Sequence, residues 1–265
     1  SNVKGILYLL LAVVVNSLQS VAVKWIGGNY SVLEIVLVRS LAALPLTLFI
    51  FRLEGKKGLP KTKQLKLEII RGILLFLSYT TFMMGLAALP LADVESIRFS
   101  GPLLITVLSV MFLSEKVTIK HWLALAAGFL GIVLIIKPGS AEFNLGTVFI
   151  FISVFLYAVI AIITRKLKNT ESSATMAYFS TLVYLAAIIF ISPLAAVIGE
   201  IPGAHASIAF FLHAWTLPTL LDLSIMIGLG FVWAIWMYFM TLAYSTAKAS
   251  IVAPFEYTSL PVNIL

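Results

Sequence analysis

Long apolar stretches alternate with short polar segments along the whole chain. A helix needs about 20 mostly apolar residues to cross the hydrocarbon core of a bilayer. The connecting segments are short except for 52–67 and 199–217, which leaves no room for a soluble domain. The pattern therefore predicts an all-α membrane protein with nine spans, at 5–25, 31–51, 68–88, 92–113, 119–136, 144–164, 173–198, 218–243 and from 248 onward.

The stretch 86–115 differs from the other apolar segments because it places charged residues inside a predicted span. It predicts the end of one helix, a tight turn at Leu89 and Pro90, and a second helix that contains Glu95 and Arg98. An ionisable group near the centre of a bilayer costs roughly 2.5–3.5 kcal/mol on insertion scales, so it is rarely there without a use. We expect the second helix to line a polar path through the protein.

The composition supports this class of protein. Hydrophobic residues make up 61% of the chain and charged residues 11%, with a mean hydropathy of +1.09, whereas soluble domains average about 45–50% apolar and 25% charged residues. The absence of cysteine excludes a disulfide framework and thiolate chemistry. The net charge of +7 comes from basic residues dispersed among the apolar segments. Membrane topology explains this charge better than nucleic-acid binding, so no nucleic-acid partner is expected.

The basic residues also predict an orientation. If Ser1 is cytoplasmic, 14 of the 18 Lys and Arg residues fall in or beside cytoplasmic segments, two fall on the other side, and Arg39 and Arg98 lie within spans. An excess of Lys and Arg in cytoplasmic loops is the usual pattern in membrane proteins. We therefore expect a multi-pass protein of the cell (inner) membrane whose N-terminus is cytoplasmic and whose segment 199–217 is external.

The order of features repeats within the chain. A shift of 141 positions, or of 156 beyond the longer loop, superimposes pairs of equal residues: Gly5 and Gly146, Ser31 and Ser172, Phe99 and Phe255. A unit of five spans reverses the second copy in the membrane, which gives two inverted halves around a central cavity. We therefore divide the chain into a first repeat at 1–140 (spans 1–5) and a second at 141–265 (spans 6–9), and we expect a tenth span after Leu265.

Five motifs resemble the drug/metabolite transporter superfamily, and more narrowly its ten-span EamA-type members: VLVRSLAALPL at 36–46, LPLADVESIRFSGPLL at 89–104, FLSEK at 112–116, GFLGIVLIIKPG at 128–139 and APFEYTSL at 253–260. The resemblance covers essentially the whole chain. It implies a two-fold five-helix bundle whose central cavity is lined mainly by spans 1, 3, 4, 6, 8 and 9. Members move amino acids, nucleotide-related metabolites, vitamins or drugs, often outward. Exporters of amino acids, including aromatic ones, are the first branch to consider.

Charged residues inside the spans are the first candidates for a substrate-binding site. Glu95 and Arg98 are three residues apart and share a helix face, so Arg98 is placed to hold a substrate carboxylate while Glu95 tunes it. The alternative is a structural ion pair. Glu256 lies deep in the second half. A carboxyl group surrounded by hydrocarbon holds a proton more readily than one in water, so Glu256 could bind a proton near neutral pH. The alternative is a neutral acid that forms a hydrogen-bonded contact between helices. Arg39 is expected to pack between helices.

Aromatic residues are the second group of candidates. Trp233 and Trp236 share a face of span 8, and Tyr157 on span 6 and Tyr79 on span 3 would complete a box around a planar or apolar side chain. The alternative for such stripes is helix packing or an interfacial belt. With Asn16, the repeat mate of Tyr157, the predicted substrate-binding residues are Asn16, Tyr79, Glu95, Arg98, Tyr157, Trp233, Trp236 and Glu256.

No catalytic pattern accompanies these residues. The three histidines stand at a helix start and in one predicted loop, without a Cys, an HExxH motif or a Ser-His-Asp order, so no enzyme, metal or other cofactor is expected. We interpret the chain as a secondary transporter of small organic solutes that works by alternating access, with amino-acid or metabolite export as the first choice. The alternatives are an uptake carrier for a nucleotide-like metabolite or vitamin, and a non-transporting lipid-handling or assembly protein.

The centre of the helix bundle distinguishes a carrier from a non-transporting protein. A hydrated cavity of several hundred Å³ would favour a carrier, and a sealed apolar centre would favour the non-transporting protein. The expected partners are a small-molecule substrate and the lipid bilayer. Small residues spaced four apart in 119–136 favour helix packing over a dimer interface, in keeping with a monomer.

Overall fold

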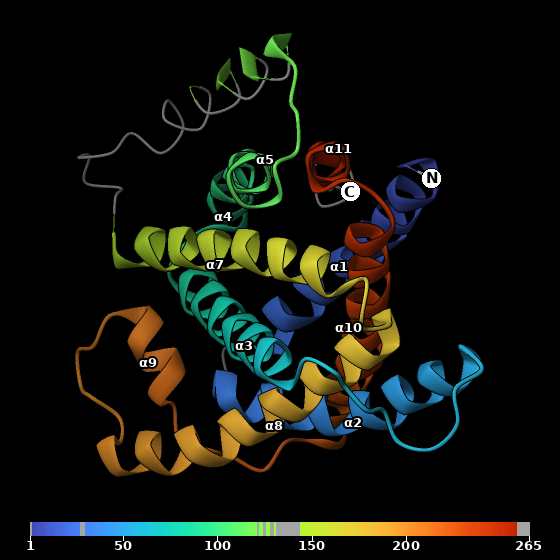
Figure 1. Ribbon diagram of the computed structural model, residues 1–265. Coiled ribbons are helices and arrows are strands. Elements are labelled where there is room, and N and C mark those ends of the chain that lie inside the picture. The colour runs from blue at the N-terminus through green and yellow to red at the C-terminus, as the bar shows by residue number, and fades with distance from the viewer. Residues whose placement is uncertain are drawn as a thin grey trace.

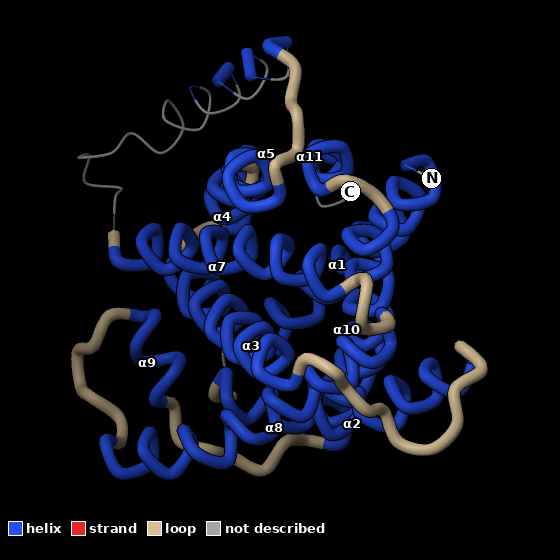
Figure 2. The backbone as a smooth tube through the Cα atoms, viewed as in Figure 1, coloured by secondary structure: helices blue, strands red, loops and turns tan. Residues whose placement is uncertain are grey.

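The chain folds into a bundle of helices. The computed structural model describes residues 2–26, 30–120 and 144–258, together with 122–123, 126–127 and 130, and every regular element within these residues is helical (Figures 1 and 2). Among them, six helices are long and apolar enough to cross a membrane: Val32–Leu53, Leu65–Ala88, Asp93–Leu113, Leu145–Leu167, Ser173–Ile198 and Leu220–Thr246. The prediction of an all-α membrane protein is confirmed.

The helices begin and end close to the predicted spans. Their bounds are α1 Asn2–Ile26, α2 Val32–Leu53, α3 Leu65–Ala88, α4 Leu91–Arg98, α5 Ser100–Leu113, α7 Leu145–Leu167, α8 Ser173–Ile198, α9 Ala206–Leu212, α10 Leu220–Thr246, α11 Ala249–Val252 and the 3-10 helix η1 Ala253–Thr258. The short helix α9 was not predicted. The predicted span 119–136 lies largely outside the described residues, as does the ninth span after residue 258.

The fourth and ninth predicted spans are not continuous α-helices. The fourth breaks at Phe99 into α4 and α5, and the ninth begins with the single turn α11 and continues as η1. Pro102 and Pro254 stand in the first turn after each break, where a missing N–H removes no helical hydrogen bond. Backbone groups freed by such a break must find partners inside the protein. The breaks therefore mark where polar groups gather between helices.

Serine residues cap helices at equivalent points of the two predicted halves. The hydroxyl of Ser31, before α2, accepts a hydrogen bond of 3.2 Å from the backbone N–H of Leu33. The hydroxyl of Ser172, before α8, accepts one of 3.2 Å from the N–H of Thr175. A serine N-cap satisfies one of the first four N–H groups of a helix. These two serines, superimposed by the 141-residue shift, fix where α2 and α8 begin.

The contacts between helices follow the relation between the two predicted halves. When each helix is replaced by its counterpart in the other half, the contacting pairs stay the same. α1 packs along α10, and the counterpart pair α7 and α3 packs in the same way. α2 contacts α8 at the centre, and the contact of α2 with α10 corresponds to that of α8 with α3. In Figure 1, α7 crosses α3 while α1 runs beside α10. The division into two domains stays a prediction, because its boundary at 140/141 lies outside the described residues.

Gly5 and Gly146 bring two of these helix pairs close together. A Cβ atom added to Gly5 of α1 would lie 2.5 Å from the Cβ of Ala247, directly after α10. A Cβ added to Gly146 of α7 would lie 2.9 Å from the Cβ of Ala88 at the end of α3. Small residues at a crossing let helix backbones approach closely inside a membrane. The two glycines superimposed by the repeat thus serve the same purpose in equivalent helix pairs.

The interior divides into two apolar clusters. The larger one joins α2, α3, α8 and α10, and the smaller one joins α1, α7, α10 and α11. Leu104 of α5 and Trp236 of α10 pack against both clusters. The central cavity, which Trp236 also lines, therefore lies between the two clusters.

Candidate functional site

A cavity at the centre of the bundle brings most of the predicted site together. Its volume is about 110 Å³, and one buried water needs roughly 10–15 Å³. It is smaller than the several hundred Å³ expected for a carrier, but charged and aromatic groups line it, so it is not a sealed apolar centre. Seven of the eight predicted substrate-binding residues line it: Asn16, Tyr79, Glu95, Arg98, Tyr157, Trp236 and Glu256.

Glu95 and Arg98 form an ion pair on the wall of the cavity. The predicted shared face is confirmed, because Nη1 of Arg98 donates to Oε1 of Glu95 across 2.9 Å. The guanidinium also lies over the ring of Phe82, 5.0 Å from its centroid. The side chain of Glu95 is 8% exposed and that of Arg98 is 31% exposed. The charge of Arg98 is therefore already balanced by a nearby acid, while one side of the guanidinium faces the cavity.

Glu256 is held by two tyrosines from two other helices. Tyr244 of α10 and Tyr157 of α7 both donate their hydroxyl hydrogen bonds to Oε1 of Glu256, the latter across 3.2 Å. Next along η1, the hydroxyl of Tyr257 donates to the backbone carbonyl of Phe99 across 3.0 Å. This bond satisfies a carbonyl at the break between α4 and α5. The two broken spans are thus joined to each other beside the cavity.

The two tryptophans of α10 lie in different surroundings. Trp236 is half-buried and lines the cavity. Trp233 does not line it: its side chain is 1% exposed and packs edge-on against Tyr184, with ring centroids 5.2 Å apart. Residues three apart on a helix differ in direction by about 60°, which is enough to turn Trp233 towards α8 and α2. The predicted aromatic box therefore lacks Trp233.

Arg71 was predicted only as one of the cytoplasmic basic residues, and the structure places it inside the bundle. It is 1% exposed. Its nitrogens donate to the hydroxyls of Thr164 at 2.8 Å, Ser180 at 2.7 Å and Thr241 at 3.0 Å. These bonds join α3 to α7, α8 and α10. The only signal in the sequence was an arginine within the first turns of an apolar helix, which is also where basic loop residues stand.

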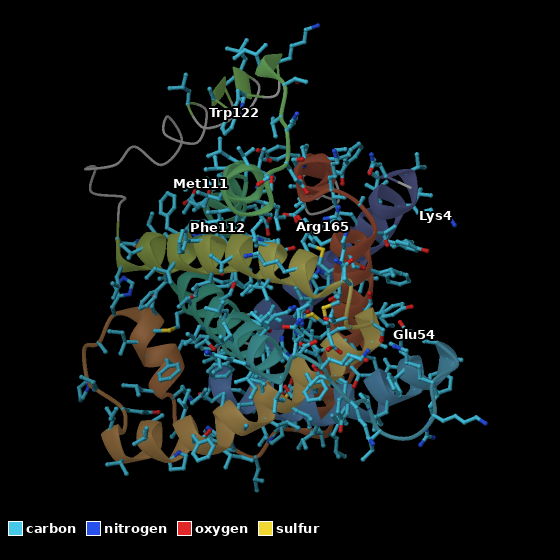
Figure 3. All side chains as sticks on the ribbon, in the orientation of Figure 1. Lys4, Glu54, Met111, Phe112, Trp122 and Arg165 are labelled. Carbon is cyan, nitrogen blue, oxygen red and sulfur yellow. The ribbon has the colours of Figure 1, made fainter. Side chains whose placement is uncertain are left out.

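Glu115 closes the same end of the bundle. Its carboxylate accepts hydrogen bonds from the backbone N–H groups of Ala249 and Ser250, at 3.2 and 3.0 Å, and from the hydroxyl of Ser250. A carboxylate at this position caps the first turn of α11 from the segment that follows α5. Arg165, at the end of α7 that faces α11 (Figure 3), lies 3.7 Å from the same carboxylate. The FLSEK motif contains Glu115, but its partner could not be found from spacing.

The opposite end of the bundle is closed by Tyr30 and Asp222. The hydroxyl of Tyr30 donates to Oδ2 of Asp222 across 2.7 Å, and the hydroxyl of Thr219 donates to the same oxygen across 2.7 Å. The hydrogen bond to the carboxylate raises the pKa of Tyr30, which favours the protonated hydroxyl that donates this bond. In addition, Oε2 of Glu34 accepts from the backbone N–H of Thr216 at 3.3 Å. These contacts tie α2 to the start of α10 and the segment before it.

The described residues contain no group of three or more His, Cys, Asp or Glu side chains that could hold a metal ion. The polar lining of the cavity, within the described part of the chain, includes two carboxylates, one partly exposed guanidinium, two amide side chains and two serines, beside aromatic faces. Such a set can hold a charged organic molecule through complementary charges and ring stacking.

Comparison with known proteins gives a family and several relatives. The model of the EamA-like transporter family matches residues 3–137. An S-adenosylmethionine uptake transporter of Rickettsia prowazekii (strain Madrid E) is 26% identical over 98% of this chain and 82% of its own. A riboflavin transporter of Brucella anthropi is 26% identical over 93% of this chain and 82% of its own. The pseudopaline exporter CntI of Pseudomonas aeruginosa (strain UCBPP-PA14) is 26% identical over 98% of this chain and 84% of its own.

A solved protein structure has the same fold, with a TM-score of 0.55 and 16% identity over 99% of this chain and 98% of its own. Two of these relatives are named as transporters and one as an exporter, and none of the three is named for amino-acid export. The family expected from the motifs at 36–46, 89–104 and 253–260 is confirmed by the match to residues 3–137. The chain belongs to the EamA-like transporter family, as a multi-pass membrane transporter of small molecules.

Proposed function

We propose that the protein carries a ring-bearing zwitterionic metabolite of the S-adenosylmethionine class into the cell, across the inner membrane, by alternating access. One observation carries the proposal: a single cavity combines the Glu95–Arg98 pair, the acid Glu256 and the aromatic faces of Tyr157 and Trp236. The similarity to an S-adenosylmethionine uptake transporter over nearly the whole chain supports the same substrate class.

The chemistry of such a substrate matches the lining. S-adenosylmethionine carries an ammonium group, a sulfonium group, a carboxylate and a planar adenine. Glu95 and Glu256 offer negative charge to the cationic groups, and an aromatic face attracts a sulfonium through its quadrupole. Burying a large apolar or aromatic group against Tyr157 and Trp236 is worth roughly 1.5–3 kcal/mol. That is a preference of about ten- to a hundred-fold for solutes with a large ring over small ones.

The cavity is small, which fits a carrier in a closed conformation. Ligand pockets usually measure roughly 300–1,000 Å³, so substrate entry needs the helices to separate at one end. Contacts of Glu115 and Arg165 hold one end, and the Tyr30–Asp222 contact holds the other. Carriers with inverted repeats expose a central site to each side in turn by rocking one half against the other. In this proposal the two sets of contacts break alternately.

The orientation in the membrane is part of the proposal. The end that carries Glu115 and Arg165 also holds the N-terminus of α1 (Figure 1). The distribution of Lys and Arg favours a cytoplasmic position for this end. Contacts of Tyr30 with Asp222 then close the external side.

Amino-acid export is the second candidate. The observation in its favour is the Glu95–Arg98 pair, because an acid and a guanidinium side by side can bind the ammonium and carboxylate of one amino acid. The similarity to a pseudopaline exporter shows that the scaffold also occurs in a protein named for export. Direction and substrate therefore need to be measured together.

Counterflow in liposomes tests the proposal. The purified protein is reconstituted, the liposomes are loaded with unlabelled S-adenosylmethionine, and entry of the labelled compound is followed. We expect accumulation above that of protein-free liposomes, with inhibition by external S-adenosylmethionine stronger than by riboflavin, phenylalanine or tyrosine. Absence of counterflow with S-adenosylmethionine, together with counterflow of an aromatic amino acid, would favour the second candidate instead.

A further inference from the structure

Arg39 is a buried cation with no carboxylate partner among the described residues. The residue is 0% exposed at the centre of α2, and none of its three side-chain nitrogens forms a hydrogen bond among the described residues. No carboxylate oxygen of the described residues lies within 4.0 Å of it. An arginine stays protonated in proteins, and a buried charge without a partner is strongly disfavoured. Within the described part of the chain, no anion balances the charge of Arg39.

Three aromatic rings surround the guanidinium. Its Cζ atom lies 3.8 Å from the ring centroid of Tyr79, 5.3 Å from that of Tyr184 and 5.1 Å from that of Trp233. Rings that stack on the faces of a guanidinium leave its edge, with its N–H donors, open for a planar acceptor. This explains why Trp233 lies outside the cavity: it forms part of the surroundings of Arg39.

Other buried polar groups around Arg39 also lack partners. The hydroxyl of Tyr79, the indole N–H of Trp233 and the side-chain oxygen of Gln19 form no hydrogen bond among the described residues. Gln19 and Arg39 both lie beside the hydroxyl of Tyr79. Buried polar groups in native proteins are nearly always paired, so several unpaired groups in one place point to a missing ligand. Most of these groups are donors, which suits a ligand with several acceptor oxygens.

The other two arginines inside the bundle differ from Arg39. Arg98 is paired with Glu95 at 2.9 Å, and Arg71 donates to hydroxyl groups on three helices. Both are therefore already satisfied. A substrate carboxylate gains more from a bare guanidinium than from one that it must share with a carboxylate.

Two tyrosine rings contact both Arg39 and the central cavity. Gln19, Tyr79 and Tyr184 line the cavity, and both tyrosine rings also contact the guanidinium. The hydroxyl of Tyr184 is fixed by a 2.8 Å hydrogen bond to the carbonyl of Leu75. The Tyr79 hydroxyl has no such bond among the described residues, so a rotation of the Tyr79 ring is the least hindered way to open Arg39 to the cavity.

We propose that Arg39, with the Tyr79 hydroxyl, binds the carboxylate of the transported substrate, while the Glu95–Arg98 pair and Glu256 face its cationic part. This inference rests on the proposed function and refines it, because it assigns the carboxylate to Arg39 rather than to Arg98. It makes Arg39 a residue that determines specificity for carboxylated over decarboxylated solutes.

Equilibrium binding to the purified protein tests this assignment. The probes are S-adenosylmethionine and decarboxylated S-adenosylmethionine, which differ only in the carboxylate. We expect the wild type to prefer the carboxylated compound by roughly thirtyfold or more, the usual loss when one partner of a buried charge pair is removed. The variant Arg39→Gln is expected to bind both compounds with nearly equal affinity, because it weakens binding of the carboxylated compound only. The control Arg52→Gln, at an exposed arginine of the same helix, is expected to keep the wild-type ratio.

Thermal unfolding without ligand separates a binding role from a packing role. Because Arg39→Gln removes an unpaired buried charge, its melting temperature is expected at or above that of the wild type. If the variant does not fold, Arg39→Lys is measured instead; its ratio of affinities is expected to fall severalfold, because an ammonium lacks the bidentate fork.

Three results would decide against the assignment. The first is a ratio of the two affinities in Arg39→Gln equal to that of the wild type; where only Arg39→Lys folds, its ratio is used. This result overturns the role of Arg39 while the proposed function stands. Stabilisation of the wild type by chloride that is lost in Arg39→Gln, together with binding of S-adenosylmethionine that chloride does not weaken, shows a site for free inorganic anions only and also overturns it. Failure of the wild type to bind either compound overturns the proposed function itself.

Discussion

Charged side chains inside the bundle differ in how many of their polar atoms already form hydrogen bonds within the protein. Glu256 accepts two tyrosine hydrogen bonds on one oxygen, which leaves its other oxygen available to a ligand in the cavity that it lines. Glu95 holds Arg98. In the proposed function, these two acids position the cationic part of the substrate and still allow its release.

Replacing Glu256 by glutamine tests its role towards cations. Glu256→Gln keeps the size and one acceptor oxygen for Tyr157 and Tyr244 but removes the charge. We expect S-adenosylmethionine to bind about ten- to a hundred-fold more weakly, since hydrogen bonds to charged groups contribute roughly 1.5–3 kcal/mol. Riboflavin, which has no cationic group, should compete as well as before. The matched variant Glu200→Gln, at an exposed acid, should change neither; an equal loss for both solutes in Glu256→Gln would indicate a structural role.

The sequence predicted the residues of the cavity better than their partners. Glu95, Arg98 and Glu256 could be found because ionisable residues stand out in apolar spans. Helical spacing placed Trp233 in the cavity together with Trp236. Spacing shows that the two side chains point about 60° apart, but it does not show which of them a neighbouring helix covers. Arg71 and Glu115 were hidden, because basic and acidic residues at helix ends are also the residues expected in loops.

Helix ends and crossings carry much of the specificity of this fold. Spans are set by hydropathy, so their bounds could be predicted to within a few residues. The positions of the breaks at Phe99 and before η1 could not be predicted. A proline is tolerated near the start of a helix, so it does not show where the preceding helical turn ends. The short helix α9 escaped for a different reason: seven residues are too few for a clear apolar period.

Removing the carboxylate of Glu115 should destabilise one end of the bundle. Glu115→Ala leaves the first N–H groups of α11 and the guanidinium of Arg165 without this acceptor. We expect a loss of about 1–3 kcal/mol in the free energy of unfolding, seen as a lower melting temperature. Glu200→Ala is the control: Glu200 also accepts a backbone N–H, from Ala214, but in an exposed loop where water can replace it. Equal melting temperatures for the two variants would contradict the capping role.

The same substitution at two glycines should have opposite effects. Gly5→Ala places a Cβ 2.5 Å from the Cβ of Ala247, whereas nothing lies within 4 Å of a Cβ at Gly228 in α10. We expect Gly5→Ala to lose about 1–3 kcal/mol of stability through overpacking. Gly228→Ala should gain up to about 1 kcal/mol, because alanine is the better helix former. A melting temperature of Gly5→Ala at or above that of the wild type would show that the α1–α10 crossing tolerates a larger residue.

At the scale of the whole molecule, the paired contacts of α1 with α10 and of α7 with α3 suit a protein that rocks between two states. The expected inverted topology places the segment 52–67 and the segment after α9 on opposite sides of the membrane. The chain has no cysteine, so single cysteines report position without background. Lys61→Cys and Leu217→Cys, both at exposed positions, should react with an impermeant thiol reagent from opposite sides. Labelling of both from one side would contradict the predicted topology.

The central claim is that one cavity takes up the substrate from each side of the membrane in turn. Val154 lines this cavity and is 6% exposed, so a cysteine there reacts only when the cavity opens. In membrane vesicles of defined orientation, we expect Val154→Cys to react with an impermeant thiol reagent from either side, and saturating S-adenosylmethionine to slow both reactions. Reaction from one side only, or reaction that S-adenosylmethionine leaves unchanged, would contradict this account.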